Sequence, residues 1–409
     1  MKKYLAVTLG ILTAIGGFVD IGDLVTNALV GARFGMSLTW AVVVGVIGIV
    51  VFAEMSGRIA AVSGRPVFDL VRERLGTRAA LVALVGSLAV TALTLTAEIG
   101  GVALAVELAL GVDYLLLVPP VLVVAWLVVW RVKFERMEQA FGLLGLLLVV
   151  FAVALWSSSP DWSELGRQAS SFAPPPAEGW PVYWYYAIAL FGAALTPYEV
   201  FFFSSGGVEE RWTTKDLGIA RLNVFIGFPL GGMLSLSIAA VSAVVLMPAG
   251  IQVDTLAQTV LPVAVQLGQI GLAVVIVGVV AATFGATLET ALATGYTIAQ
   301  YFGWQWGKWV RPRDAPLFHT VVIAALLGGG ALLLTTVDPI KVTEYSVVFS
   351  AVALPLTYLP ILMVANDPDY LGGRTNRWLA NALGQVYLVI ILLASLAAIP
   401  LMIWTKAGQ

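Results

Sequence analysis

The chain has 409 residues, of which 60% are hydrophobic and only 11% are charged. Soluble domains carry about 25% charged residues, so this composition excludes a protein whose whole surface faces water. The formal net charge is −2, which favours no particular class of partner. Cysteine is absent and His319 is the only histidine. The lack of cysteine excludes disulfide bonds, thiolate metal sites and thiol catalysis.

Apolar runs recur along the whole chain, and Gly, Pro and charged residues separate them. Because a helix needs about 20 apolar residues to cross the hydrocarbon core of a bilayer, the sequence predicts eleven membrane spans. They cover residues 5–34, 38–62, 79–110, 114–130, 138–157, 181–207, 217–247, 260–302, 316–336, 340–365 and 377–404. We therefore expect an all-α polytopic membrane protein with a single transmembrane domain over residues 1–409.

The distribution of Lys and Arg residues orients these spans. With eleven spans, 18 of the 22 Lys and Arg residues fall on one face of the membrane, and Arg33, Arg167, Lys341 and Lys406 fall on the other. Positive residues gather in the cytoplasmic loops of membrane proteins. We therefore expect a multi-pass protein of the plasma (inner) membrane, with its N-terminus in the cytoplasm and its C-terminus outside.

The first span carries Asp20, Ile21, Gly22 and Asp23 near its middle. A carboxylate at that depth costs roughly 2.5 to 3.5 kcal/mol on insertion, and Gly22 weakens the helix around it. Non-helical backbone inside a membrane is tolerated where it lines a polar cavity. The pattern therefore predicts a broken helix whose two carboxylates line such a cavity.

The sixth span repeats this arrangement around Ala193, Thr196, Pro197, Tyr198 and Glu199. Pro197 removes a backbone donor and clashes with the preceding turn, and Glu199 adds a third carboxylate. A lone proline more often marks a simple kink, and a lone threonine more often bonds to its own helix. The matching positions of the two interruptions favour function, because broken helices at equivalent places indicate an inverted-repeat secondary transporter.

The two interruptions divide the chain into two halves of five helices each. The halves cover residues 1–157 and 181–365, an external loop joins them over 158–180, and residues 366–409 form an eleventh helix and a tail. Since five is an odd number, the second half enters the membrane from the opposite face. The loop is expected to act as a connector, and a role as a lid stays open.

The chemistry of the two breaks favours a cation. Carboxylates and the negative, carbonyl-bearing end of a half-helix attract positive charge, whereas Asp20 and Asp23 would repel the carboxylate of an amino acid. Carboxylates, a hydroxyl and carbonyls form an all-oxygen set, which suits hard ions such as Mg²⁺, Ca²⁺ or Mn²⁺. The sequence thus predicts a hard divalent cation as the transported substrate.

At these residues the chain resembles the NRAMP family of divalent-metal transporters. Asp20 and Gly22 match the Asp-Pro-Gly-Asn motif of the family's first helix, while Ile21 replaces the proline and Asp23 replaces the asparagine. The similarity extends through Leu354 and Pro355 in the tenth span, and covers nearly the whole chain at low identity.

The sixth span departs from this family in two places. Ala193 and Pro197 match, and the family's alanine offers its backbone carbonyl to the ion. Thr196 stands where a methionine thioether is expected, and Tyr198 replaces a histidine associated with proton transfer. Replacing a soft thioether by a hydroxyl is what a magnesium-accepting member needs, and the chain looks most similar to the NRAMP-related magnesium transporters.

The resemblance implies a LeuT-type 5+5 inverted repeat plus an eleventh helix, with alternating access. It implies a metal site formed by Asp20, Asp23, Ala193 and Thr196. A vestibule or second shell around it comprises Gly22, Tyr198, Glu199 and the third-helix acid Glu98. The expected substrate is a partly hydrated Mg²⁺, and Mn²⁺ as well. Because Tyr198 replaces the histidine and Leu95 stands where the family often has an acid, proton coupling is not expected.

Two alternatives use the same scaffold: a proton-coupled importer of Mn²⁺ or transition metals, and a symporter of amino acids or other organic solutes. A third is a sensor that binds metal without transporting it. No hydrolase, kinase or nucleic-acid motif is present, so we expect no enzyme activity, no cofactor, no nucleic-acid partner and no obligate protein partner. Among other acids within the spans, Glu54 is expected to be satisfied by water or by Arg58 one turn on, and Glu289 to pair with a neighbouring helix.

Overall fold

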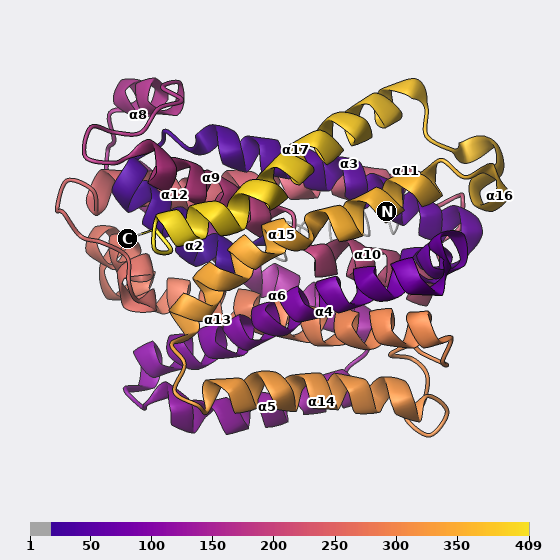
Figure 1. Cartoon of the computed structure of the whole chain (residues 1–409). Coiled ribbons are helices and arrows are strands. Elements are labelled where there is room, and N and C mark those ends of the chain that lie inside the picture. Colours follow the sequence, from indigo (N-terminus) through magenta and orange to yellow (C-terminus); the bar gives the residue numbers. More distant parts are fainter. Residues whose placement is uncertain (1–17, 409) are drawn as a thin grey trace.

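The computed structural model describes residues 18–408, and every regular element in that range is a helix (Figure 1). In chain order these are α2 (Ile21–Phe34), α3 (Thr39–Ser63), α4 (Val67–Leu110), α5 (Tyr114–Arg131), α6 (Phe134–Gly145), η1 (Leu146–Val149), α7 (Val150–Ser157), α8 (Trp162–Ala169), α9 (Trp180–Ala194), α10 (Pro197–Glu209), α11 (Leu217–Leu222), η2 (Asn223–Gly227), α12 (Phe228–Val245), α13 (Leu256–Phe302), α14 (Pro316–Leu333), α15 (Pro339–Ala365), α16 (Pro368–Leu371), η3 (Gly372–Arg374) and α17 (Trp378–Trp404).

Ten helical stretches of the described range are long and apolar enough to cross a membrane. They coincide with ten of the eleven predicted spans, which confirms the all-α polytopic architecture. The remaining prediction, residues 5–34, lies partly outside the described residues, and its described part is α2. Helices dominate because a bilayer offers the backbone no water, so each segment must satisfy its own N–H and C=O groups.

Two of the long helices kink at a glycine. Gly76 in α4 has φ 77°, and Gly268 in α13 has φ 64°. Glycine adopts positive φ without the steric cost that a Cβ imposes. The predicted span 79–110 therefore begins only after the kink in α4, and residues 67–75 form a separate helical piece before it. In α13 the kink falls inside the predicted span 260–302, so residues 256–267 form a separate piece there too.

The predicted external loop, residues 158–180, contains a helix of its own, α8. Asp161 caps it by accepting hydrogen bonds from the amides of Ser163 and Glu164. The segment is also fastened to the end of α2, because Glu178 forms an ion pair of 2.8 Å with Arg33. Gln168 accepts a hydrogen bond of 3.2 Å from the amide of Met36. The connector is thus a structured strap rather than an open loop.

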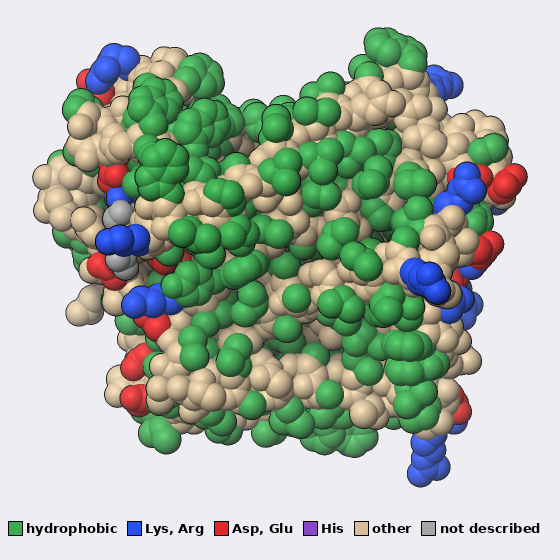
Figure 2. Space-filling view, viewed as in Figure 1, with side chains coloured by type: hydrophobic (Ala, Val, Ile, Leu, Met, Phe, Trp, Pro, Cys, Tyr) green, Lys and Arg blue, Asp and Glu red, His purple; other side chains and the backbone are tan. Residues whose placement is uncertain are grey.

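The helices form layers around a central pair. α4 and α13 pack along each other, α5 and α14 lie beside them on one side, and α15 crosses the other side between α4 and α17 (Figure 1). The broken helices, α2 and the α9–α10 pair, pack against α3, α12 and α15. Hydrophobic side chains form a broad belt, and charged side chains gather at the two ends of the bundle (Figure 2).

Several arginines lie together at one end of the bundle, joined by hydrogen bonds and ion pairs. Arg58 contacts the carbonyl of Arg374 and shares Glu54 with Arg221, and Arg74 pairs with Asp367 nearby. We call this end, which carries Arg58, Arg74, Arg221 and Arg374, the arginine-rich end. Gly408, close to the C-terminus, lies at the opposite end, where its carbonyl accepts a hydrogen bond from Arg33.

Candidate functional site

The first predicted break lies where α2 begins. Phe18 is helical, Val19 and Asp20 are not, and the helix starts at Ile21. Asp20 has φ −95° and ψ −175°, and its Oδ1 accepts a hydrogen bond of 2.9 Å from the amide of Asp23. An Asp at the N-cap satisfies an amide that the first helical turn leaves free. One of the two predicted ligand carboxylates therefore also starts the helix.

The second predicted break separates α9 from α10. Leu195 (φ −125°, ψ 48°) and Thr196 (φ −66°, ψ 130°) lie between the two helices, and Pro197 opens α10. Proline suits the first helical position, because its missing N–H would have had no partner there. The last four carbonyls of a helix have no partner within it, and those of Ala193 and Ala194 are among them. The break thus presents carbonyl oxygens next to the Thr196 hydroxyl.

Hydrogen bonds join the two breaks to each other and to α4. Tyr198 donates to Asp20 Oδ2 over 3.4 Å, and Glu98 Oε1 accepts from the amide of Ile21 at 3.1 Å. Within α10, the Thr196 hydroxyl donates to Glu199 Oε2 at 3.2 Å. The structure thus links Asp20, Tyr198 and Glu98 directly, while Thr196, Glu199 and Ala193 are tied to them through the chain at the second break.

Close packing against one residue of α15, Val347, holds both breaks at the same height along that helix. A Cβ placed on Gly22 would lie 2.9 Å from Val347 Cγ1, and one placed on Gly192 would lie 2.2 Å from the carbonyl oxygen of Val347. Both distances are shorter than real Cβ contacts, so only glycine fits at these two positions without a shift. Gly22, predicted to belong to the second shell, therefore brings the first break against α15.

The electrostatics of the site are negative. Asp20 and Asp23 are 4% and 3% exposed. No ion pair in the described part of the chain includes Asp20 or Asp23, so neither aspartate has a Lys or Arg partner there. Burying an unpaired charge is very costly. The region therefore has the character of a cation-binding site.

Two further oxygens near the first break lack partners. Glu98 Oε2 and Asn27 Oδ1 are buried without a hydrogen bond, and such an orphaned group costs roughly 1 to 3 kcal/mol. The other atoms of these side chains are engaged, since Asn27 Nδ2 donates to the carbonyl of Asp23 at 2.9 Å and to its Oδ1 at 3.3 Å. The site is thus rich in acceptors that no protein donor uses.

The donor set is mixed rather than purely acidic. Among the described residues, no group of three or more His, Cys, Asp and Glu side chains is placed to hold a metal ion. An ion here would therefore need carbonyl, hydroxyl or water oxygens beside the two aspartates. This requirement fits Mg²⁺, which keeps several water ligands in proteins, and it fits the predicted contributions of Ala193 and Thr196.

Two residues near the site had been assigned no role there. Asn27 holds Asp23 in place through its side-chain amide. The sequence could have indicated this contact, because residues four apart lie on the same face of a helix. Glu289 in α13 was expected to pair with a neighbouring helix. No hydrogen bond or ion pair holds it in the described part of the chain, and its charge lies within electrostatic range of Asp20.

Comparisons with known proteins identify the family of the chain. The model of the Nramp family, described as natural resistance-associated macrophage protein-like, matches residues 10–400. A relative from Deinococcus radiodurans, named divalent metal cation transporter MntH, is 26% identical over 388 residues, covering 92% of this chain and 85% of the relative. A relative of the same name from Aeromonas hydrophila is 25% identical over 393 residues, covering 92% of this chain and 91% of the relative.

Solved structures share the fold at low identity. The Eremococcus coleocola manganese transporter, in complex with an aromatic bis-isothiourea compound, superposes with a TM-score of 0.68 at 16% identity, covering 98% of this chain and 93% of the other. Mhp1, a nucleobase-cation-symport-1 family transporter, gives 0.61 at 15% identity, covering 97% and 92%. The fold is therefore of the LeuT type. Because the family model spans nearly the whole chain, this protein belongs to the Nramp family.

Proposed function

We propose that this protein carries divalent metal cations across the cell membrane by alternating access, with Mg²⁺ as the preferred ion and Mn²⁺ as a second substrate. Asp20, Asp23, the carbonyl of Ala193 and the hydroxyl of Thr196 bind the ion. The observation that carries the proposal is the pair of buried aspartates without a positive protein partner. Relatives named as divalent metal cation transporters, and a manganese transporter of the same fold, support the class of substrate.

The preference for a hard ion rests on the oxygen-only donor set. A thioether favours softer metals, and Thr196 provides a hydroxyl at the position where the family is expected to have methionine. Mg²⁺ loses its water reluctantly, so the ion enters with part of its hydration shell. Tyr198, Glu199, Gly22 and Glu98 surround this site and contact the hydrated ion or its ligands.

We also propose that transport is not coupled to protons. Tyr198 replaces the expected histidine and donates a hydrogen bond to Asp20. Unlike the imidazole of a histidine, a phenol does not exchange protons readily at neutral pH. The arginine-rich end faces the cytoplasm, in keeping with the positive-inside rule. The C-terminus, at the opposite end, then lies outside the cell. A reporter enzyme that works only outside the cell should therefore be active when it is fused to the C-terminus.

Uptake into liposomes tests the substrate. The purified protein should take up Mg²⁺ and Mn²⁺, with Ca²⁺ and Cd²⁺ added in a competition series. Asp20→Ala should abolish uptake, whereas Glu107→Ala, a half-buried acid at the end of α4 far along the chain from both breaks, should leave it unchanged. If folded wild-type protein moves neither Mg²⁺ nor Mn²⁺, the proposal is wrong. Stabilisation by a zwitterionic amino acid instead of a metal would favour the solute symporter.

A pH-sensitive dye inside the same liposomes tests the coupling. We expect no pH change that depends on the metal. A metal-dependent acidification of the lumen would instead favour the proton-coupled importer, and it would leave the assignment of the metal site intact.

A further inference from the structure

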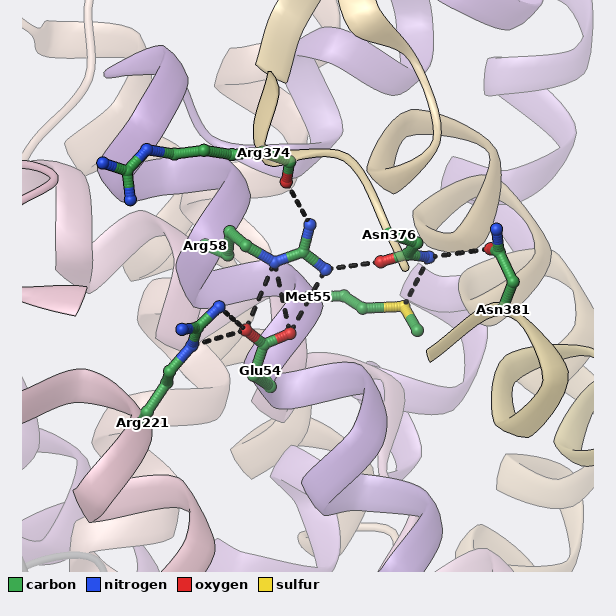
Figure 3. Close-up of polar contacts among 7 residues, drawn as sticks. All are labelled: Glu54, Met55, Arg58, Arg221, Arg374, Asn376 and Asn381. Atoms are coloured by element: carbon green, nitrogen blue, oxygen red, sulfur yellow. Dashed lines mark hydrogen bonds and ion pairs between the residues drawn. The ribbon is translucent and has the colours of Figure 1, made fainter. Parts of the chain in front are cut away.

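A polar cluster at the arginine-rich end, buried at Arg58 and exposed at Arg221, joins α3, α11 and the connection between α15 and α17 (Figure 3). Glu54 in α3 accepts hydrogen bonds from Arg58 at 3.2 Å and from Arg221 in α11 at 2.9 Å. One carboxylate is thus shared by two guanidinium groups. Arg58 is only 5% exposed, so its partners must offset the cost of burying its positive charge.

Arg58 carries the cluster to the connection between α15 and α17. Its guanidinium donates to the carbonyl of Arg374 at 2.6 Å and to the side chain of Asn376. The side chain of Asn376 in turn donates to Asn381 in α17 at 3.2 Å. The backbone amide of Asn376 donates to the carbonyl of Ala365 at the end of α15. Every arm of the Arg58 guanidinium therefore has an acceptor, and these acceptors lie on segments far apart in the sequence.

The same connection is also fastened to α4. Arg74, in the piece of α4 before the Gly76 kink, forms an ion pair of 2.7 Å with Asp367. Residues 367–376 thus hold α3 on one side and α4 on the other. α3 packs with the broken helix α10, whereas α4 packs with α13 and α14. The connection therefore bridges the helices that carry the second break and the helices that surround them.

The helix that carries Arg221 ends in a structural irregularity two residues further on. Residues Asn223–Gly227 form a π-helical segment, η2, between α11 and α12. Such segments are rare and frequently lie at functional sites. Asn223 Oδ1 is buried there without a hydrogen-bond partner. Arg221 thus lies on a short helix that is joined to α12 through a π-helical turn.

We propose that Glu54, Arg58, Arg221 and Asn376 form a latch that closes the metal site toward the arginine-rich end. Release of the latch lets α3, with α10 and α11, part from α4 and α15, and opens the breaks to this end. The inference rests on the proposed alternating access of the site, and it adds the device that controls one of the two openings.

The shared carboxylate is the part of the latch to test. Glu54→Gln keeps the shape of the side chain but removes the negative charge that holds two guanidinium groups together. Glu73→Gln is the matched control, because Glu73 accepts from Arg65 at 2.7 Å at the same end. That pair is solvent-exposed, and exposed pairs contribute little.

Thr357 in α15 is a suitable reporter of this opening. It is fully buried, and its hydroxyl has no partner, so Thr357→Cys breaks no hydrogen bond. Its neighbours face the two groups of helices, since Leu356 lies against Gly86 of α4 and Tyr358 packs on Phe52 of α3. Ten residues past Val347, it lies roughly 15 Å from the breaks toward the arginine-rich end.

Ser242 in α12 reports on the opposite opening. It is also buried with an unpartnered hydroxyl, and it lies one turn beyond Ala239, which contacts Gly31 of α2. Since the chain has no cysteine, Thr357→Cys and Ser242→Cys each provide a single thiol. The full chain in lipid nanodiscs, without metal, is treated with a charged methanethiosulfonate reagent.

Glu54→Gln should speed the labelling of Cys at position 357 by about tenfold and slow that of Cys at position 242, whereas Glu73→Gln should change neither. If the variant does not fold, Asn376→Ala, which keeps all three charges, should give the same reciprocal change. Unchanged labelling at 357 in a folded variant overturns the latch, as does faster labelling at both positions. Because no metal is present, failure of the proposed transport leaves this test unaffected.

Discussion

Both breaks press against Val347, and this contact predicts different outcomes for two Gly→Ala substitutions. A Cβ on Gly22 would lie 2.9 Å from Val347 Cγ1, about 0.5 Å short of an ordinary 3.4 Å contact. A Cβ on Gly192 would lie 2.2 Å from the carbonyl oxygen of Val347, about 1.2 Å short. The first clash is with a side chain that can be removed, and the second is with backbone that cannot.

Each substitution overpacks the interior, which costs about 1 to 3 kcal/mol, and Gly192→Ala should be the more damaging. Val347→Ala removes Cγ1, so it should recover about 1 kcal/mol of the loss caused by Gly22→Ala. Recovery is partial, because the new methyl still lies 3.0 Å from Asp20 Oδ1. The same change should leave the effect of Gly192→Ala unaltered, since the carbonyl remains.

Two double-mutant cycles measure this difference as free energies of unfolding in mixed micelles. The expected coupling energy is about 1 kcal/mol for the pair 22 and 347 and close to zero for the pair 192 and 347. Equal rescue of both glycine variants would refute the reasoning, since it would mean that α15 moves as a whole and that the breaks are not fixed at one level. A Gly192→Ala variant as stable as the wild type would refute it too.

Three further outcomes follow from the site and its surroundings. The Asp20→Asn variant should unfold with a free energy within about 1 kcal/mol of the wild type, because Asn also caps helices. Calorimetry should nevertheless show at least a tenfold loss of Mg²⁺ affinity. Unchanged affinity would exclude Asp20 as a ligand. Thr196→Met should shift competition toward Cd²⁺ and Mn²⁺ over Mg²⁺ by about tenfold, and an unaltered ranking would count against the donor set. Burial lowers the pKa of Lys308 from 10.5 to about 8, so the unfolded state binds more protons between these values and stability should rise with pH there. Lys308→Met should remove that part of the rise, and identical pH profiles would contradict this.

The spans and both breaks were predictable because they follow from local rules. A bilayer requires long apolar helices, and a carboxylate or a proline inside one is conspicuous. The pairing of Glu54 with Arg58 was also foreseen, since the two residues are one helical turn apart, and the structure confirms it. Interactions within one turn are accessible from sequence alone.

Contacts between distant segments were not predictable in this way. Arg58 and Asn376 are separated by 318 positions, and no periodicity connects a residue of α3 with the segment before α17. Similarly, nothing in the sequence marks Val347 as the residue against which Gly22 and Gly192 pack. The kinks at Gly76 and Gly268 could not be read from the sequence either, because a glycine in an apolar run is equally common where helices pack closely.

The charge at the breaks bears on why the substrate is divalent. Asp20 and Asp23 are almost fully buried, so a site closed at both ends takes its charge out of water, and the cost of doing so is high for an unpaired ion. One divalent cation offsets both carboxylates, whereas a monovalent cation leaves a net negative charge and a zwitterion offsets neither. Closure is therefore least costly with a divalent ion in place. A carrier must pass through this closed state to alternate, so in the site proposed above the two buried aspartates would select for divalent charge before the other ligands discriminate among divalent ions.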